Sequence, residues 1–244
     1  MIPRPGARAT VIISAFVVAL AATGCTGDEV DGPSLAVSGS SAPLPPGVPT
    51  PQQLADALVT SVEVPADYDE VAPSEDGGQS DVFEGTCLEG VHDLDQQVGA
   101  EPVSEARVEF SHQDGDGEAQ ILSSIGVFTD EEAIADALTA FSDRLDDCPS
   151  VSRTDEDGVT YNFQVEVSAE PTLDDVDQQL LVQLDGIIAA GPEALRLSFG
   201  ILLARTEGYV SRLSTAELGE DHGLDREIEP LAAQQHRRLV GLLS

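Results

Sequence analysis

Residues 159–167, VTYNFQVEV, alternate apolar and polar side chains without a break. This period of two is typical of a β-strand that buries one face. Three further apolar runs follow, over residues 178–189, 194–204 and 206–213, and short turns such as Gly191-Pro192-Glu193 separate them. Successive strands joined by short turns pair in antiparallel fashion. The C-terminal half of the chain therefore predicts an antiparallel meander.

Two more strands are predicted upstream of the meander. Residues Glu105–His112 and Ala119–Phe128 alternate in the same way, and the segment between them, QDGDGE, contains Asp-Gly twice, which favours a hairpin. The alternative interpretation is a calcium loop, since Asp114, Asp116 and Glu118 alternate. A complete Ca²⁺ site needs more oxygen ligands and a distal glutamate. We therefore expect a hairpin, and no metal or other cofactor.

Three segments have the apolar spacing of helices. They are Gln52–Ser61, a helix that begins with the capping box Thr129–Glu132 and runs to Asp147, and a last helix from an Asp225 cap to Leu242. The middle helix places four apolar residues on one stripe: Ile134, Leu138, Phe141 and Leu145. Strands and helices together predict an α+β domain with a single antiparallel β-sheet of about six strands flanked by helices.

An export signal precedes this domain. Two arginines lie ahead of an uncharged apolar run, residues 9–22, which is short for a membrane span of about 20 residues. The run ends in Ala22-Thr23-Gly24-Cys25, a lipobox. We therefore predict a lipoprotein signal peptide over residues 1–24, cleavage before Cys25, and diacylglycerol on the Cys25 thiol. A plain secretory signal and an uncleaved anchor are the alternatives.

The lipidated cysteine is predicted to lead into a spacer. Residues 25–51 are rich in Pro, Gly and Ser and lack an apolar period, which is typical of a flexible linker. The folded domain is predicted over residues 52–244. Because two acyl chains are enough to hold a protein at a bilayer, we expect this domain on the outer face of the cytoplasmic membrane.

The charge of the chain excludes some partners. It has 11 basic residues, all of them arginine, against 45 acidic ones, a net charge of −34. Nucleic acid is excluded because basic side chains supply most of the affinity for phosphate, and an anionic lipid surface is disfavoured for the same reason. The lack of lysine beside abundant Ala, Gly, Val and Asp indicates a high-GC bacterium such as an actinobacterium, with a haloarchaeal source as the alternative.

The three cysteines divide into one lipidation site and one pair. With Cys25 modified by lipid, Cys87 and Cys148 remain as an even pair in an oxidising compartment. A disulfide between them would close a loop of about 60 residues and contribute about 4 kcal/mol by the chain-entropy model. Metal binding would need further thiols or histidines nearby in the sequence, and none are close.

No motif in the sequence indicates catalysis. It contains no GxSxG, HExxH, P-loop or GxGxxG pattern. The four histidines are scattered; His92-Asp93-Leu94-Asp95 could ligate a metal or orient a base, but such pairs arise readily in an acid-rich chain. We expect no catalytic residues and no enzymatic activity.

Three groups of residues resemble a known family. Leu54-Ala55-Asp56-Ala57-Leu58 followed by Val64-Pro65-Ala66-Asp67-Tyr68 is similar to its opening helix and turn. Val127-Phe128 and the helix that ends at Cys148 are similar to its central strand and aromatic-then-cysteine helix, and the closing strand pair and C-terminal helix match its ending. The chain thus resembles the PknH-like extracellular sensor domains of actinobacterial lipoproteins and receptor kinases. The resemblance implies an antiparallel sheet flanked by helices around a cleft, used to sense extracellular ligands.

We therefore expect a non-catalytic, lipid-anchored lipoprotein of the cell envelope that binds a ligand or acts as a sensor. Its expected partners are the membrane, through Cys25, and an unidentified small molecule, lipid or protein of the envelope. One alternative is an envelope hydrolase with a buried pair of carboxylates of raised pKa. Another is a structural or assembly role, for which an exposed apolar patch would be the sign.

Overall fold

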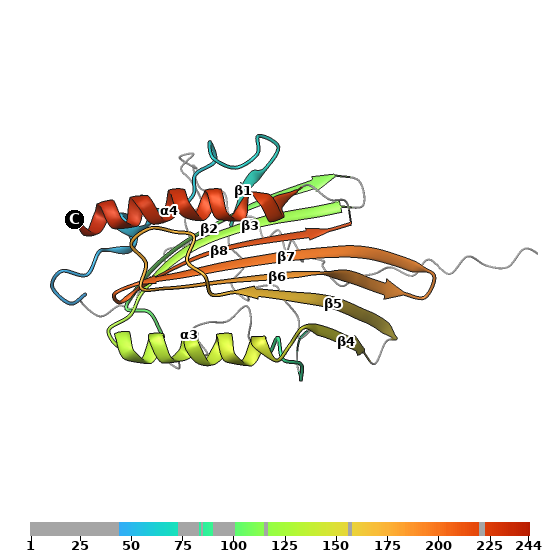
Figure 1. The fold of residues 1–244 in the computed structure, drawn as a ribbon. Helices are drawn as coiled ribbons and strands as arrows, with labels where there is room; N and C mark the ends of the chain where they lie inside the picture. Colours follow the sequence, from blue (N-terminus) through green and yellow to red (C-terminus); the bar gives the residue numbers. More distant parts are fainter. Residues whose placement is uncertain are drawn as a thin grey trace, which may run out of the picture.

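The computed structural model describes residues 44–72, 83, 85–89, 101–114, 117–155, 158–219 and 223–244. They form an α+β domain around one antiparallel sheet of eight strands in the order β1-β2-β3-β8-β7-β6-β5-β4 (Figure 1). The strands are β1 (Asp69–Val71), β2 (Ser104–Asp114), β3 (Gly117–Val127), β4 (Ser150–Thr154), β5 (Val159–Ser168), β6 (Gln178–Ala190), β7 (Glu193–Thr206) and β8 (Tyr209–Leu218).

The sequence predicts about six strands, and the two that it misses are the outermost strands of the sheet. β1 and β4 are the edges of the sheet, and they have only three and five residues. Both are short and polar, as edge strands commonly are, so neither carries an apolar period of its own. The six inner strands are the predicted ones, although β8 extends to Leu218 instead of ending at residue 213.

The two long helices pack on opposite faces of the sheet. Along β7, Leu202 and Ala204 belong to the core that includes α4 (Ile228–Leu243). The alternate residues of that strand, Ile201 and Leu203, belong to the core that includes α3 (Glu131–Asp146). α4 contacts β8 and β7, and Figure 1 shows it toward the β1–β3 side of the sheet and α3 toward the β5–β4 side. The central strands are therefore buried on both faces.

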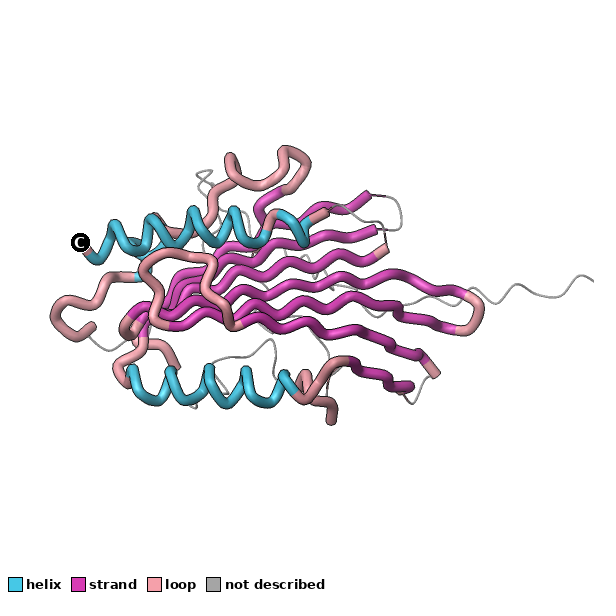
Figure 2. The backbone as a smooth tube through the Cα atoms, viewed as in Figure 1, coloured by secondary structure: helices cyan, strands magenta, loops and turns pink. Residues whose placement is uncertain are grey.

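The outer strands are covered on one face only. β5 buries Tyr161, Phe163 and Val165 beneath α3, whereas Asn162 and Gln164 on its other face are exposed. Figure 2 shows the β6–β7 hairpin extending past the neighbouring strands. Here Gly186 of β6 lies so close to β5 that a Cβ atom on it would overlap the Asn162 carbonyl oxygen.

The helix boundaries differ from the predicted ones. The first helix, α1, ends at Ala55, because the chain turns away and the Val59 amide donates to the Ser123 hydroxyl of β3. α3 is capped by the Asp130 carboxylate, which accepts from the Ala133 amide, and not by the predicted capping box. The predicted apolar stripe of α3 is fully buried.

The last helix also begins later than expected. Asp225 lies within a 3₁₀ turn, η1 (Leu224–Arg226), and α4 starts at Ile228 without a side-chain cap. Its apolar face is buried as predicted, apart from Leu242, which is partly buried. Within the described ranges, no helix combines the length and the apolar character that crossing a bilayer requires.

Candidate functional site

A group of polar side chains lies on the α4 face of the sheet, beyond the start of α4. Strand pairing aligns His112 of β2, Ala119 of β3 and Glu217 of β8 in one row. Tyr68, from the turn before β1, packs against His112 with ring centroids 5.4 Å apart. Glu217 is only 4% exposed, and its Oε1 accepts from the Leu224 amide at 3.2 Å. We call Tyr68, His112 and Glu217, with Asp67, the tyrosine site.

The electrostatics of this site keep the tyrosine protonated. Burial, and then the negative charges of Glu217 and Asp67, raise the pKa of Tyr68 well above its ordinary value. An ordinary tyrosine is already protonated at neutral pH, and the raised pKa means that Tyr68 keeps its proton further into the alkaline range. The hydroxyl is buried, and no described residue accepts from it. A buried donor without an acceptor is costly. Among the described residues, Glu70 Oε1 and His236 Nδ1 are likewise buried without a hydrogen-bond partner.

His112 is oriented by the backbone of the same turn. Its Nδ1 lies 2.9 Å from the Asp67 carbonyl oxygen, and because a carbonyl only accepts, Nδ1 carries a proton. Its Nε2 lies 3.6 Å from the Asp67 carboxylate. The site thus holds a hydrogen-bond donor in Tyr68 and a buried carboxylate in Glu217. It also holds the His112 imidazole, whose orientation is set by the Asp67 carbonyl. This arrangement can bind a group that accepts from a phenol and donates to a carboxylate.

Two polar networks hold the segment that carries Tyr68. The Ser123 hydroxyl donates to Gln235 of α4 at 2.8 Å, and Gln235 in turn donates to the Ser124 carbonyl. The Arg238 guanidinium donates to the carbonyls of Ala57 and Leu58 and to the Glu63 carboxylate. The segment from α1 to Tyr68 is therefore fastened to both the sheet and α4.

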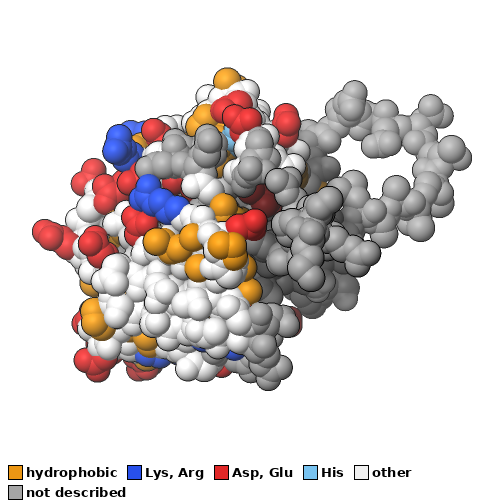
Figure 3. Space-filling view, turned by 90° about the vertical axis from the view of Figure 1, so that its right-hand side faces the viewer, with side chains coloured by type: hydrophobic (Ala, Val, Ile, Leu, Met, Phe, Trp, Pro, Cys, Tyr) orange, Lys and Arg blue, Asp and Glu red, His pale blue; other side chains and the backbone are white. Residues whose placement is uncertain are grey.

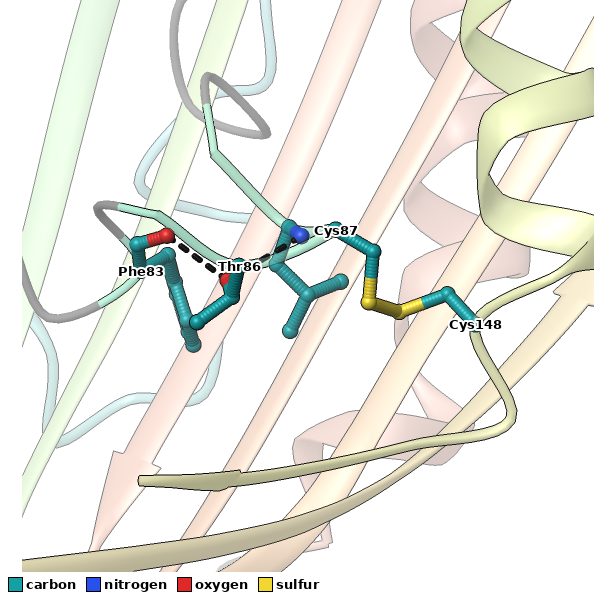
Figure 4. Close-up of a disulfide and its surroundings, with 5 residues drawn as sticks. Phe83, Thr86, Cys87 and Cys148 are labelled. Carbon is teal, nitrogen blue, oxygen red and sulfur yellow. Dashed lines mark hydrogen bonds between the residues drawn. A yellow bond between two sulfur atoms is a disulfide. The ribbon is translucent and has the colours of Figure 1, made fainter. Parts of the chain in front are cut away.

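The predicted disulfide is confirmed, because Cys87 and Cys148 are joined (Figure 4). Cys148 lies just after α3, and the short segment 85–89 is held against it. In that segment the Thr86 hydroxyl donates to the Phe83 carbonyl at 2.6 Å and accepts from the Leu88 amide. The side chains of Phe83 and Leu88 are buried in the α3 core, so the bond anchors a connecting segment to that core.

The other residues considered in the sequence do not assemble into a site. Cys25, with the predicted signal peptide and most of the linker, lies outside the described residues, as do Asp116, His92 and His222. His236 is buried on α4 with its Nε2 2.8 Å from the Asp174 carbonyl oxygen, a structural contact. In the part of the chain that the structure describes, no three His, Cys, Asp or Glu side chains could hold a metal ion.

The two rival functions find little support among the described residues. Glu217 is the one acidic side chain there that is fully buried, and Glu70, which is partly buried, also has its Oε1 atom shielded from solvent. The large apolar side chains that they expose are Val62, in the turn segment between α1 and β1, and Ile187 of β6. Sequence reasoning missed Glu217 because it lies beyond the predicted end of its strand. Tyr68, by contrast, lies in the Val64–Tyr68 segment, whose sequence predicts a turn but gives no sign that the tyrosine hydroxyl is buried.

A disulfide-fastened sheet with a helix on each face is the class of compact α+β domain suited to an oxidising compartment outside the cytoplasm. The sequence model of the PknH-like extracellular domain matches residues 40–196, and the chain therefore belongs to that family. The family indicates a sensor-type extracytoplasmic domain.

The fold is similar to that of a solved structure. The crystal structure of the extracellular domain of PknH from Mycobacterium tuberculosis superposes with a TM-score of 0.53, covering 79% of this chain and 96% of that one. The two sequences are 11% identical over this match, so the likeness concerns the fold alone. A comparison with curated proteins found no match.

Proposed function

We propose that this protein is a lipid-anchored lipoprotein on the outer face of the cytoplasmic membrane that binds a small envelope ligand and does not catalyse a reaction. The anchor is the diacylated thiol of Cys25, which follows from the lipobox Ala22-Thr23-Gly24-Cys25. The ligand site is the tyrosine site. The observation that carries this assignment is the buried Tyr68 hydroxyl, which can donate a hydrogen bond to a ligand beside the buried Glu217 carboxylate.

The chemistry of the site restricts the ligand. Tyr68 donates a hydrogen bond, whereas Glu217 and Asp67 favour a donor or a positive charge. The whole chain carries a net charge of −34 and repels anions. The ligand that fits is therefore a small neutral or cationic molecule with a hydroxyl or amino group.

Native mass spectrometry of the full-length protein, extracted from its own membranes, tests the proposal. We expect a polypeptide that starts at Cys25 and carries diacylglycerol, together with a discrete extra mass that dissociates on activation. Cys25→Ser should abolish the lipid and leave the extra mass. Tyr68→Phe should reduce the occupancy of the extra mass, whereas Tyr209→Phe, a partly buried tyrosine on β8, should not.

Either half of the proposal can fail separately. An unlipidated N-terminus would refute the anchor. A bare polypeptide mass, or an extra mass that Tyr68→Phe leaves unchanged, would refute the ligand site. The variant itself should fold, because it removes a hydroxyl that makes no hydrogen bond within the described structure.

A further inference from the structure

The two edges of the sheet are protected to very different degrees. β1 is three residues long and presents Asp69 and Glu70. β4 is longer, and on the α4 face of the sheet it presents Ser150, Ser152 and Thr154, all exposed and all uncharged. Natural edge strands are usually blunted by charges or proline, because a free edge invites pairing with another chain. β4 carries neither on these three residues.

The backbone groups of the same three residues point away from the sheet. The Val165 amide of β5 donates to the Pro149 carbonyl at 3.0 Å, and the Asp155 amide donates to the Val159 carbonyl at 2.9 Å. Because hydrogen-bonded pairs alternate along an antiparallel ladder, Val151 and Arg153 also face β5. The N–H and C=O groups of Ser150, Ser152 and Thr154 therefore face the free edge, and no described residue hydrogen-bonds to them.

The strand is also held in the shape that pairing requires. The Ser152 hydroxyl donates to Asn162 Oδ1 at 2.7 Å, and the hydroxyls of Thr154 and Thr160 are 3.1 Å apart. These contacts tie β4 to β5 from the side and leave its outer backbone groups in place. Figure 3 shows that the lower part of this end of the molecule, at the height where Figure 1 draws β4 and β5, is mostly neither charged nor apolar.

Acidic residues stand at both ends of the strand, whose own charged residue, Arg153, is half-buried on the α3 face with Val151. Asp146 and Asp147, at the end of α3, are exposed just before it. Asp155, which is half-buried and whose carboxylate accepts from the Val159 amide and the Tyr161 hydroxyl, follows it directly. A second copy pairing antiparallel about Ser152 would bring the acidic end of one strand against the acidic end of the other. Like charges placed opposite each other are destabilising, so the ends oppose self-association and favour a partner of opposite charge.

We propose that the free edge of β4 is a docking site for an extended segment of a partner protein, with an uncharged β-forming centre and Arg or Lys at both ends. The segment adds a ninth strand to the sheet, as in other cases of β-strand addition. Its backbone pairs with Ser150, Ser152 and Thr154, and its basic ends lie near Asp147 and Asp155. This site is on the opposite edge of the sheet from β1 and shares no residue with the tyrosine site.

A fluorescently labelled peptide of sequence RKTVTVTKR, titrated into the detergent-solubilised full-length protein, tests the proposal by anisotropy. We expect saturable binding with a Kd below about 1 mM that weakens as salt is raised, since exposed charges are screened. A peptide with acidic ends, EETVTVTEE, should not bind. In the wild-type protein, the amides of Ser150, Ser152 and Thr154 should gain protection from hydrogen exchange when RKTVTVTKR is added.

Two substitutions at one position separate the backbone from the side chain. Ser152→Pro removes an outward N–H that β5 does not use, so the fold should survive, and binding should weaken by about tenfold or more as that hydrogen bond and its neighbours are lost. Ser152→Ala keeps the N–H, so its Kd should stay within about twofold of the wild type. Asp147→Asn should weaken binding by about two- to fivefold, a typical value for one exposed ion pair.

Several outcomes would overturn the docking site. They are no saturable binding up to 1 mM, equal binding by the acidic-ended peptide, binding that Ser152→Pro leaves intact, and protection that appears away from β4. Dimerisation of the protein through β4 would also overturn it, since it would mean that the acidic ends do not prevent self-pairing. If Ser152→Pro fails to fold, the exchange experiment on the wild-type protein decides.

Discussion

Replacing Arg238 by alanine should loosen the attachment of the N-terminal segment to α4. The guanidinium donates to the Ala57 carbonyl at 3.2 Å, to the Leu58 carbonyl at 2.5 Å and to Glu63 Oε1 at 2.7 Å. Both partners of the ion pair are largely shielded, with side chains 31% and 15% exposed. The variant would therefore leave two carbonyls and one carboxylate without their donor.

The magnitude follows from these three contacts. A hydrogen bond to a charged group contributes about 1.5–3 kcal/mol when shielded, and partial exposure of Arg238 reduces this because water can replace some of the contacts. We expect Arg238→Ala to lower the free energy of unfolding by about 3 kcal/mol at pH 7. Arg237, its exposed neighbour on α4, provides the matched control, and Arg237→Ala should change the stability by less than about 0.5 kcal/mol.

The loss should depend on pH in a defined direction. Burial acts to raise the pKa of Glu63, but hydrogen bonds from Arg238 and Thr60, together with the charge of Arg238, outweigh it and hold the pKa below its ordinary value of 4.5. A carboxyl with a lowered folded pKa stabilises the protein above its unfolded pKa, and this contribution is lost as the pH falls through the folded pKa. The difference between wild type and Arg238→Ala should therefore narrow below about pH 4.5.

Urea unfolding followed by circular dichroism, at pH 7 and at several values down to pH 3, measures both effects. A double-mutant cycle with Glu63→Gln should give a coupling energy of about 1 kcal/mol at pH 7. The reasoning would be refuted by a loss smaller than about 1 kcal/mol at pH 7, or by a difference from wild type that stays constant across the acid range.

Three further substitutions probe the sheet and its core. Gly186→Ala should lower the melting temperature by several degrees, because its Cβ would overlap the Asn162 carbonyl oxygen and force β5 and β6 apart; an unchanged thermal transition would contradict this close approach. Phe141→Ala should cost about 3–5 kcal/mol in urea unfolding, since that ring is buried at the centre of the α3 core. Replacing Cys87 and Cys148 together by serine should cost about 4 kcal/mol at most, and reduction of the wild-type protein should reproduce that loss.

The strands and the α3 stripe could be predicted because each carries its own apolar period. The eleven residues of β3 alternate buried and partly buried side chains from end to end. β1 and β4 are too short to show such a period: β1 has no fully buried residue, and β4 buries only Val151 in the α3 core. The end of α1 depended on Ser123, which lies 64 residues from Val59 and draws the Val59 amide out of the helix. No local pattern contains that contact.

The candidate site could not be predicted from the sequence because it also depends on contacts between distant residues. Tyr68 and Glu217 are 149 positions apart, and only the strand order β1-β2-β3-β8 brings them to one face. Because β8 is buried on both faces, its burial does not alternate, and no periodic pattern marks Glu217 as a buried residue. The disulfide, by contrast, could be predicted because two cysteines allow only one pairing once Cys25 is assigned to the lipid.

The sheet offers a physical connection between the two proposed sites. One row of residues runs across the α4 face from His112 through Ala119, Glu217, Ser198, Asp185 and Gln164 to Ser150 of β4. At about 4.8 Å per strand, this row spans roughly 29 Å.

Any shift of β8 that ligand binding at Glu217 produces must be accommodated by the strands between it and β4. Linkage then requires reciprocity: if a ligand at the tyrosine site changes the affinity of β4 for a basic segment, that segment changes the affinity for the ligand by the same factor. Tyr68→Phe, which touches no residue of β4, distinguishes coupled sites from independent ones. If the sites are coupled, this variant abolishes the effect of the ligand on RKTVTVTKR binding. It leaves the affinity of the ligand-free protein for the peptide unchanged.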